Sequence, residues 1–219
     1  MNIVLATRNK KKVEEIKRIV KDMPISVSSL DDFPDCPEVE EDGKTFEDNA
    51  AKKAKAVSDY TKMPALADDS GLEVYALNGA PGVLSARYAG ENADDRKNFE
   101  KLLDKMRSVP DEKRGARFAC CIALVFPVGD LSVGFDSSIR VATRLSETLR
   151  DGKAETFMGY SEGSIGREPK GSNGFGYDPV FYPAGCKKTF AEMADAEKDS
   201  LSHRGAALKK LHEYLKGRK

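Results

Sequence analysis

Two acidic segments of the chain contain the oxygen ligands that a hard metal ion prefers. Residues 38–42 include Glu38, Glu40, Glu41 and Asp42, and residues 68–71 read Asp-Asp-Ser-Gly directly after a short apolar run. Mg²⁺ is often held by one or two carboxylates together with phosphate oxygens. Carboxylates beside a buried strand need a partner or a metal. The two segments therefore predict a magnesium site, against the plainer alternatives of an Asp-rich turn and a solvated acidic loop.

A basic turn near the start of the chain has the composition of a phosphate site. A short strand leads through a polar turn into a helix, whose N-terminus favours an anion. The turn has no Walker glycine pattern, so it is not a P-loop, and a solvated basic surface is the alternative. The candidate phosphate-binding residues are Thr7, Arg8, Asn9, Lys10, Lys11 and Lys12.

A glycine-rich loop at residues 171–179 has features of a site for a nucleobase. Its glycines permit close backbone approach, and Phe175 and Tyr177 have rings that could stack on a base. Asp178 could accept from a ring N–H, while His203 and Arg204 form a donor pair suited to a keto oxygen or a phosphate. A tight turn with packed aromatic rings and a structural histidine is the alternative reading.

These residues require an alternation of strands and helices to position them. Hydrophobic periodicity predicts helices from Lys10, over residues 45–61, after a cap at Asn92, and over residues 202–215. It predicts strands over residues 2–6, 64–67 and 117–126 and within 131–160, with residues 68–71 breaking the second of them. This order indicates an α/β fold with a mixed sheet.

The composition limits the classes of protein to which the chain can belong. Its 219 residues, 40% hydrophobic, suffice for one core or one domain with two lobes. Lys plus Arg and Asp plus Glu each number 36, so we expect no nucleic-acid partner. No apolar run is long enough to span a membrane, so we expect no membrane partner. The four cysteines form no CxxC pair, which indicates reduced thiols and a cytoplasmic location.

Five segments together resemble the inosine triphosphate pyrophosphatase family, also called the dITP/XTP diphosphatases. They are LATRNKKKVEEI, EEDGKTFEDNAAKKA, ADDSGLEVYALNGAPGVLSARYAG, GSNGFGYDPVF and EKDSLSHRGAALK, in the family's order. They cover most of residues 2–128 and 159–216. The family's usual Glu-Asn-Ala triplet is Asp48-Asn49-Ala50 here, and residues 129–157 match no family segment. We expect this unmatched stretch to extend a hairpin at a lobe edge or a dimer surface.

The resemblance implies an enzyme that hydrolyses ITP, dITP and XTP to the monophosphate and pyrophosphate. It also implies a two-lobed fold spanning residues 1–219 around a long mixed sheet, with the substrate in a cleft between the lobes, a homodimer, and dependence on Mg²⁺. By position, Asp69 is the catalytic base, and Glu40 and Asp69 are the metal ligands, although Glu41 beside Glu40 is an open alternative. The implied substrate-binding residues are Thr7 to Lys12, Lys53, Ser70, Phe175, Gly176, Tyr177, Asp178, Lys198, His203 and Arg204.

The 6-keto group shared by ITP and XTP gives a chemical reason for the expected selectivity. Arg204 could donate to that oxygen, whereas adenine presents an amino donor there, and such a mismatch supports large discrimination. Two alternatives remain open at this point. One is a pyrophosphatase for modified pyrimidine or methylated guanine nucleotides, and the other is a nucleotide-binding sensor without turnover.

Overall fold

The computed structural model describes residues 1–128 and 152–217, which form two compact units. Unit 1 comprises residues 1–69, 121–158 and 207–219, and unit 2 comprises residues 70–120 and 159–206, each taken over its described part. The chain therefore passes between the units several times. The predicted hairpin within residues 129–157 falls largely on residues 129–151, which lie outside the described residues.

Unit 1 begins with two short parallel strands, of which the first is largely buried. Strand β1 (Asn2–Leu5) pairs in parallel with β2 (Ser26–Ser29), with Asn2 opposite Ser26 and Leu5 opposite Ser29. Helix α1 (Lys10–Val20) connects them and begins where the Asn9 side chain accepts a hydrogen bond from the Lys12 amide. The predicted strand–turn–helix is confirmed.

Helix α2 (Phe46–Thr61) is the predicted helix over residues 45–61, with Thr45 as its N-cap. Its buried positions recur three and four residues apart, so they form one stripe along the helix. Most are apolar or small, but two polar side chains, Asn49 and Lys53, lie within the stripe one turn apart. The buried positions are Phe46, Asn49, Ala50, Lys53, Ala54, Val57 and Ser58.

Strand β3 (Ala65–Val74) corrects one prediction. Residues 68–71 were expected to break the strand after Ala67, yet the strand continues through them for ten residues in all. Asp68 and Asp69 are 1% and 5% exposed, so they are buried strand residues rather than turn residues. Local composition favours a turn here, but lysine partners for both carboxylates offset the cost of burying them.

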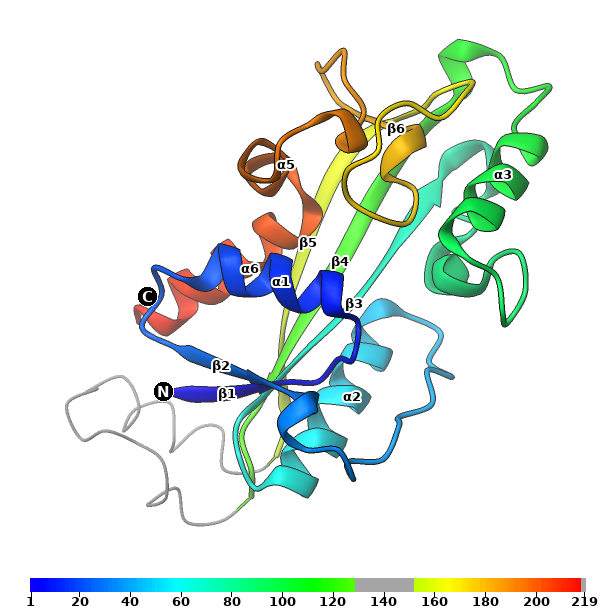
Figure 1. Cartoon of the computed structure of the whole chain (residues 1–219). Helices are drawn as coiled ribbons and strands as arrows, with labels where there is room; N and C mark the ends of the chain where they lie inside the picture. The colour runs from blue at the N-terminus through cyan, green and yellow to red at the C-terminus, as the bar shows by residue number, and fades with distance from the viewer. Residues whose placement is uncertain (129–151, 218–219) are drawn as a thin grey trace. The chain divides into compact units, whose positions relative to one another are not determined.

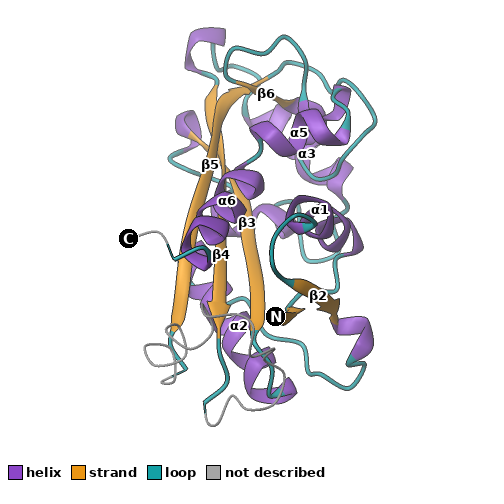
Figure 2. Ribbon diagram, turned by 90° about the vertical axis from the view of Figure 1, so that its left-hand side faces the viewer, coloured by secondary structure: helices purple, strands orange, loops and turns teal. Residues whose placement is uncertain are grey.

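Six strands form one sheet in the order β2-β1-β3-β4-β5-β6. Strand β4 (Gly115–Val125) matches the predicted strand over residues 117–126, and it is followed by β5 (Ala154–Ile165) and β6 (Phe181–Pro183). Strands β1 and β3 are parallel and β5 and β6 are antiparallel, so the predicted mixed α/β sheet is confirmed. Figures 1 and 2 show β3, β4 and β5 running side by side as the longest strands.

Unit 2 packs around an apolar cluster that includes Leu72, Phe118, Phe181 and Phe190. Helix α3 (Asp95–Lys105) begins two residues later than predicted, because Asp94 rather than Asn92 accepts the capping bond, from the Lys97 amide. Helix α5 (Asp195–Leu201) was not predicted. It contains Lys198 and precedes the closing helix α6 (His203–Leu215). Short 3₁₀ helices cover Leu30–Asp32, Tyr75–Leu77, Gly82–Arg87, Asp111–Lys113, Asp178–Val180 and Phe190–Glu192.

The part of the chain that the structure describes contains no helix both long enough and apolar enough to cross a membrane. The four cysteines all lie within that part, and none of them forms a disulfide.

Candidate active site

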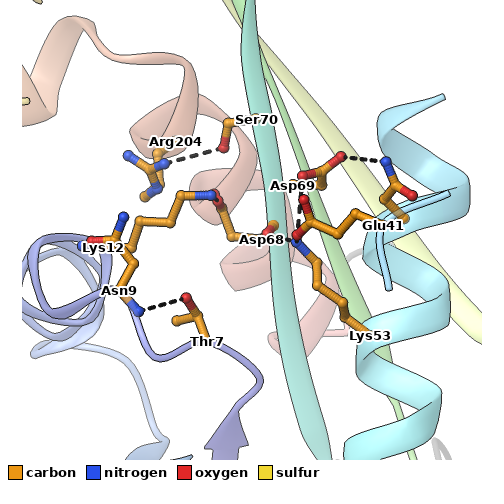
Figure 3. A network of polar contacts seen from close by, with 10 residues as sticks. Thr7, Asn9, Lys12, Glu41, Lys53, Asp68, Asp69, Ser70 and Arg204 are labelled. Carbon is orange, nitrogen blue, oxygen red and sulfur yellow. Dashed lines mark hydrogen bonds and ion pairs between the residues drawn. The ribbon is translucent and has the colours of Figure 1, made fainter. Parts of the chain in front are cut away.

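The adjacent residues Asp68 and Asp69 send their side chains to opposite sides of β3. Successive residues of a strand alternate between its two faces, and here each carboxylate meets a lysine from a different helix. Lys12 of α1 reaches Asp68 on one side and Lys53 of α2 reaches Asp69 on the other (Figure 3). The alternation converts two neighbouring carboxylates into two separate ion pairs, both within unit 1.

The ammonium group of Lys53 donates hydrogen bonds to three oxygen atoms. It donates to the Asp68 carbonyl at 2.8 Å, to Asp69 Oδ1 at 3.3 Å, and to Glu41 Oε1. The Lys53 side chain is 11% exposed and that of Asp69 is 8% exposed, so these charges are largely removed from water. Buried charges of this kind persist only when they are paired and hydrogen-bonded.

Burial and charge act in opposite directions on the Asp69 carboxyl group. Burial raises the pKa of Asp69 above its ordinary value, while the ammonium groups of Lys53 and Lys12 oppose that rise. For Lys53, burial lowers the pKa, but Asp69 and Glu41 outweigh it and the net pKa is raised. Lys53 therefore stays a cation, and Asp69 is a stronger base than an exposed aspartate.

Asn49 is a residue of this cluster that the sequence analysis did not single out. Its amide Nδ2 donates to Asp69 Oδ2 at 3.1 Å, and its Oδ1 accepts from the Gly43 amide at 2.8 Å. One sequence signal could have found it, because Asn49 precedes Lys53 by one helical turn and so shares its face of α2.

In the acidic loop of residues 38–42, Glu41 rather than Glu40 contacts Lys53. Glu41 is half-buried and ion-paired with Lys53, whereas Glu40 is exposed. Asp42 reaches Lys52 at 2.6 Å on the surface. No group of three His, Cys, Asp or Glu side chains suited to a metal ion occurs in residues 1–128 and 152–217. A cation at this site would therefore need oxygen atoms from its ligand or from water.

The basic turn is ordered by its own side chains. Thr7 Oγ1 accepts from the Asn9 amide at 3.2 Å, and Asn9 caps α1. The Arg8 guanidinium donates to three backbone carbonyls, those of Leu30, Pro34 and Cys36, the last at 2.8 Å. Arg8 thus ties the turn to the segment after β2, while Lys10 is exposed at the start of α1. Lys11 follows Lys10 and is exposed as well.

In unit 2 the glycine-rich loop folds around Asp178. Its Oδ2 accepts from the Phe175 amide at 2.8 Å and from Lys198 Nζ at 2.7 Å. Gly174 has φ +73°, and a Cβ there would lie 2.1 Å from Asp178 Oδ2. Lys198 Nζ also lies 4.8 Å from the centre of the Phe175 ring, within the range of a cation–π contact.

Phe175, not Tyr177, is the aromatic ring that meets the cations. The Arg204 guanidinium carbon lies 5.7 Å from the Phe175 ring centre, and its NH2 donates to Ser70 Oγ at 3.1 Å. Tyr177 is buried in the core, where its hydroxyl donates to the Ser85 carbonyl. His203 stacks on Phe118 with an interplanar angle of 10°. Gly176 has φ +62° and open space where a Cβ would be.

Together these features define a class, namely α/β proteins in which a central strand of a mixed sheet carries paired buried carboxylates, each bound to a lysine. Within that class the chain belongs to the Ham1 family, whose model matches residues 3–214.

Relatives and solved structures resemble the chain over almost its full length. The dITP/XTP pyrophosphatase of Geobacter sulfurreducens is 48% identical, over 97% of this chain and 96% of that protein. The dITP/XTP pyrophosphatase of Desulforamulus reducens is 49% identical, over 98% of this chain and 96% of that protein. The structure of a HAM1 protein from Coxiella burnetii matches with a TM-score of 0.81 and 39% identity over all of both chains. The crystal structure of the nucleoside-triphosphatase / dITP/XTP pyrophosphatase from Mycobacterium abscessus matches with a TM-score of 0.71 and 43% identity, over 96% of this chain and 98% of that one.

Proposed function

We propose that the chain is an enzyme that hydrolyses the non-standard purine nucleoside triphosphates ITP, dITP and XTP to the monophosphate and pyrophosphate. The observation that carries the proposal is the buried Asp69 carboxylate on β3, held between Lys53 and Asn49. A sensor without turnover needs no base of raised pKa at its phosphate site, so this observation favours an enzyme. The dITP/XTP pyrophosphatases named above support the substrate class.

The residues of unit 1 suit the triphosphate. The N-terminus of α1 and the ammonium groups of Lys12 and Lys53 are donors and positive charges that stabilise phosphate oxygens. We assign Thr7, Asn9, Lys10 and Lys11 to the same end of the substrate, together with the backbone at Arg8.

The residues of unit 2 suit the base. Phe175 offers a ring for stacking, and the buried Arg204 and His203 supply donors for a 6-keto oxygen. Lys198 and Asp178 hold each other by an ion pair at 2.7 Å and thereby shape the loop that contains Gly176 and Tyr177. Ser70 follows Asp69 directly in the chain and bonds Arg204.

The oxygen atoms around Lys53 fit Mg²⁺. The carboxylate oxygens of Asp69 and Glu41 beside Lys53, with exposed Glu40 as the neighbouring alternative to Glu41, are the hard ligands that this ion takes. Mg²⁺ often has few protein ligands and retains waters and substrate phosphates, which suits this site. When bound, Mg²⁺ would neutralise phosphate charge and polarise the reacting phosphoryl group.

The protein's own part in the reaction follows from the placement of Asp69. Asp69 takes a proton from a water whose oxygen attacks the α-phosphorus, the bond from that phosphorus to the bridging oxygen breaks, and pyrophosphate leaves with the bond's electron pair. Lys12 and Lys53 stabilise the charge that develops on the phosphate oxygens. Both lysines are already held by the carboxylates of β3, so little reorganisation is needed.

The test is pyrophosphate release from a panel of nucleotides with Mg²⁺ present. We expect kcat/KM for ITP, dITP and XTP to exceed that for ATP by at least about tenfold, the worth of one charged hydrogen bond. EDTA should abolish turnover. A preference for modified pyrimidine or methylated guanine nucleotides, or binding of ITP without release, would refute the proposal.

A cytoplasmic location and a homodimer complete the proposal. Four free cysteines support a reducing compartment. The homodimer comes from the family resemblance, and light scattering on the purified chain tests it directly.

A further inference from the structure

The Asn49 amide connects two parts of the candidate site that are far apart in the sequence. Asn49 lies on α2 and is 1% exposed. Its oxygen accepts from Gly43, two residues after Glu41, and its nitrogen donates to Asp69 of β3. A buried amide is costly unless its polar atoms have partners, and here both the oxygen and the nitrogen have one.

The chemistry of the two partners fixes the orientation of the amide. The Gly43 N–H can only donate, so it requires the amide oxygen, and an ionised Asp69 carboxylate can only accept, so it requires the NH₂ group. A flipped amide would place donor against donor on one side and acceptor against acceptor on the other.

The glycine at position 43 is an independent sign of this close approach. A Cβ at Gly43 would lie 2.6 Å from Asn49 Oδ1 and 2.8 Å from the Asp48 Cβ, distances that side chains do not tolerate. The backbone of the acidic loop therefore packs directly against the amide, and even one methyl group would displace it.

We propose that Asn49 is a positioning residue that sets the separation between the acidic loop and Asp69 and reserves Asp69 Oδ1 for the reaction. Asn49 occupies Asp69 Oδ2, which leaves Oδ1 as the oxygen facing Lys53. The same amide holds the loop that carries Glu41, so both carboxylates are positioned by one side chain. This inference rests on the proposed function, because it assigns Asp69 as the base.

The decisive variant is Asn49→Asp, which keeps an acceptor for Gly43 but loses the donor to Asp69. We expect kcat for dITP to fall about 10²-fold, because misplacing a reacting group by about 1 Å costs that much, with KM changed less than threefold. Gly43→Ala places a methyl group against the Asn49 amide but keeps both of the amide's hydrogen-bonding groups. We expect it to displace Asp69 less than Asn49→Asp does, and so to lower kcat about tenfold.

Asn98→Asp is the matched control. Asn98 is also buried, but it lies on α3 in unit 2. It accepts from the Ala89 amide at 2.8 Å and donates to the Ala86 carbonyl at 3.0 Å, so within the described part of the chain its partners are backbone groups rather than a carboxylate. We expect it to lower Tm while kcat stays within threefold of the parent. Equal loss of kcat in Asn98→Asp and Asn49→Asp, or a kcat within threefold of the parent in Asn49→Asp, would overturn the proposal.

Hydrogen exchange at the Gly43 amide gives a readout that does not depend on turnover. Exchange should remain slow in Asn49→Asp and become at least about tenfold faster in Asn49→Ala, where the acceptor is lost. Unchanged exchange in Asn49→Ala would refute the bridge. If the parent chain released no pyrophosphate from dITP, the proposed function and the catalytic part of this inference would both fail, while the exchange result would still decide whether Asn49 joins the loop to α2.

Discussion

At the scale of single residues, neighbouring aspartates on β3 have different partners and therefore different expected roles. Asp68 pairs with Lys12 and Asp69 with Lys53 and Asn49. Both are buried, so a simple loss of charge would destabilise the fold in either case. Burial raises the pKa of the Asp69 carboxyl group, which suits a base.

Asp69→Asn should lower kcat for ITP by at least about 10²-fold, the usual cost of losing a general base. Asp68→Asn should instead raise KM, because Lys12 loses a carboxylate that orients it, while kcat falls less than tenfold. Steady-state kinetics and thermal unfolding of both variants check this. Equal losses of kcat would contradict the separate roles.

The buried Arg204 allows a second prediction at this scale. Arg204→Lys keeps the charge but removes the planar fork, so the preference for ITP over ATP should fall by about tenfold or more. Arg114→Lys is the control, because Arg114 is also buried but donates to backbone carbonyls, including Ile165 O at 2.7 Å. It should lower Tm and leave the preference unchanged. Equal erosion of the preference by both variants would count against Arg204 as a base-recognition residue.

At the scale of elements, α2 combines a buried apolar stripe with two polar side chains, Asn49 and Lys53, to which we assign roles in the proposed reaction. Its end is as well defined as its start, because Lys62 adopts a left-handed conformation with φ +56° and its amide donates to the Ser58 carbonyl. This conformation is costly for a residue with a Cβ and free of that cost for glycine.

Lys62→Gly should therefore raise the free energy of unfolding by about 0.5–1 kcal/mol. The control is Lys55→Gly inside the same helix, which should lower it by about 1 kcal/mol, since glycine is a poor helix former. Chemical denaturation monitored by circular dichroism measures both. A loss of stability in Lys62→Gly would show that the end of α2 does not carry this strain.

At the scale of the whole molecule, burial decides which cysteines can react. Burial raises the pKa of Cys121 to about 12 and raises that of Cys36, so their reactive thiolates are scarce at pH 8. Cys120 is also fully buried, whereas Cys186 is partly exposed. The native protein should therefore take up one iodoacetamide group, at Cys186, and the denatured protein four. Rapid modification of Cys120 or Cys121 in the folded state, read by peptide mass spectrometry, would contradict the core described here.

Much of the architecture could be predicted from local patterns. The helix Phe46–Thr61, the strand Asn2–Leu5 and the closing helix His203–Leu215 follow from capping residues and hydrophobic periodicity, which act between residues close in sequence. The family motifs likewise indicated Lys53, Asp69 and Arg204, because each lies in a distinctive short segment.

The tertiary structure decided what depends on partners distant in the sequence. Asp68 and Asp69 have the composition of a turn, and they form part of a strand because lysines 56 and 16 residues away neutralise them. Asn49 became visible as a bridge only when Gly43 and Asp69 came together around it. The sequence alone determined which residues are candidates for the chemistry, apart from Asn49. Tertiary packing decided how those residues pair, because the free energy of a buried charge depends on what surrounds it.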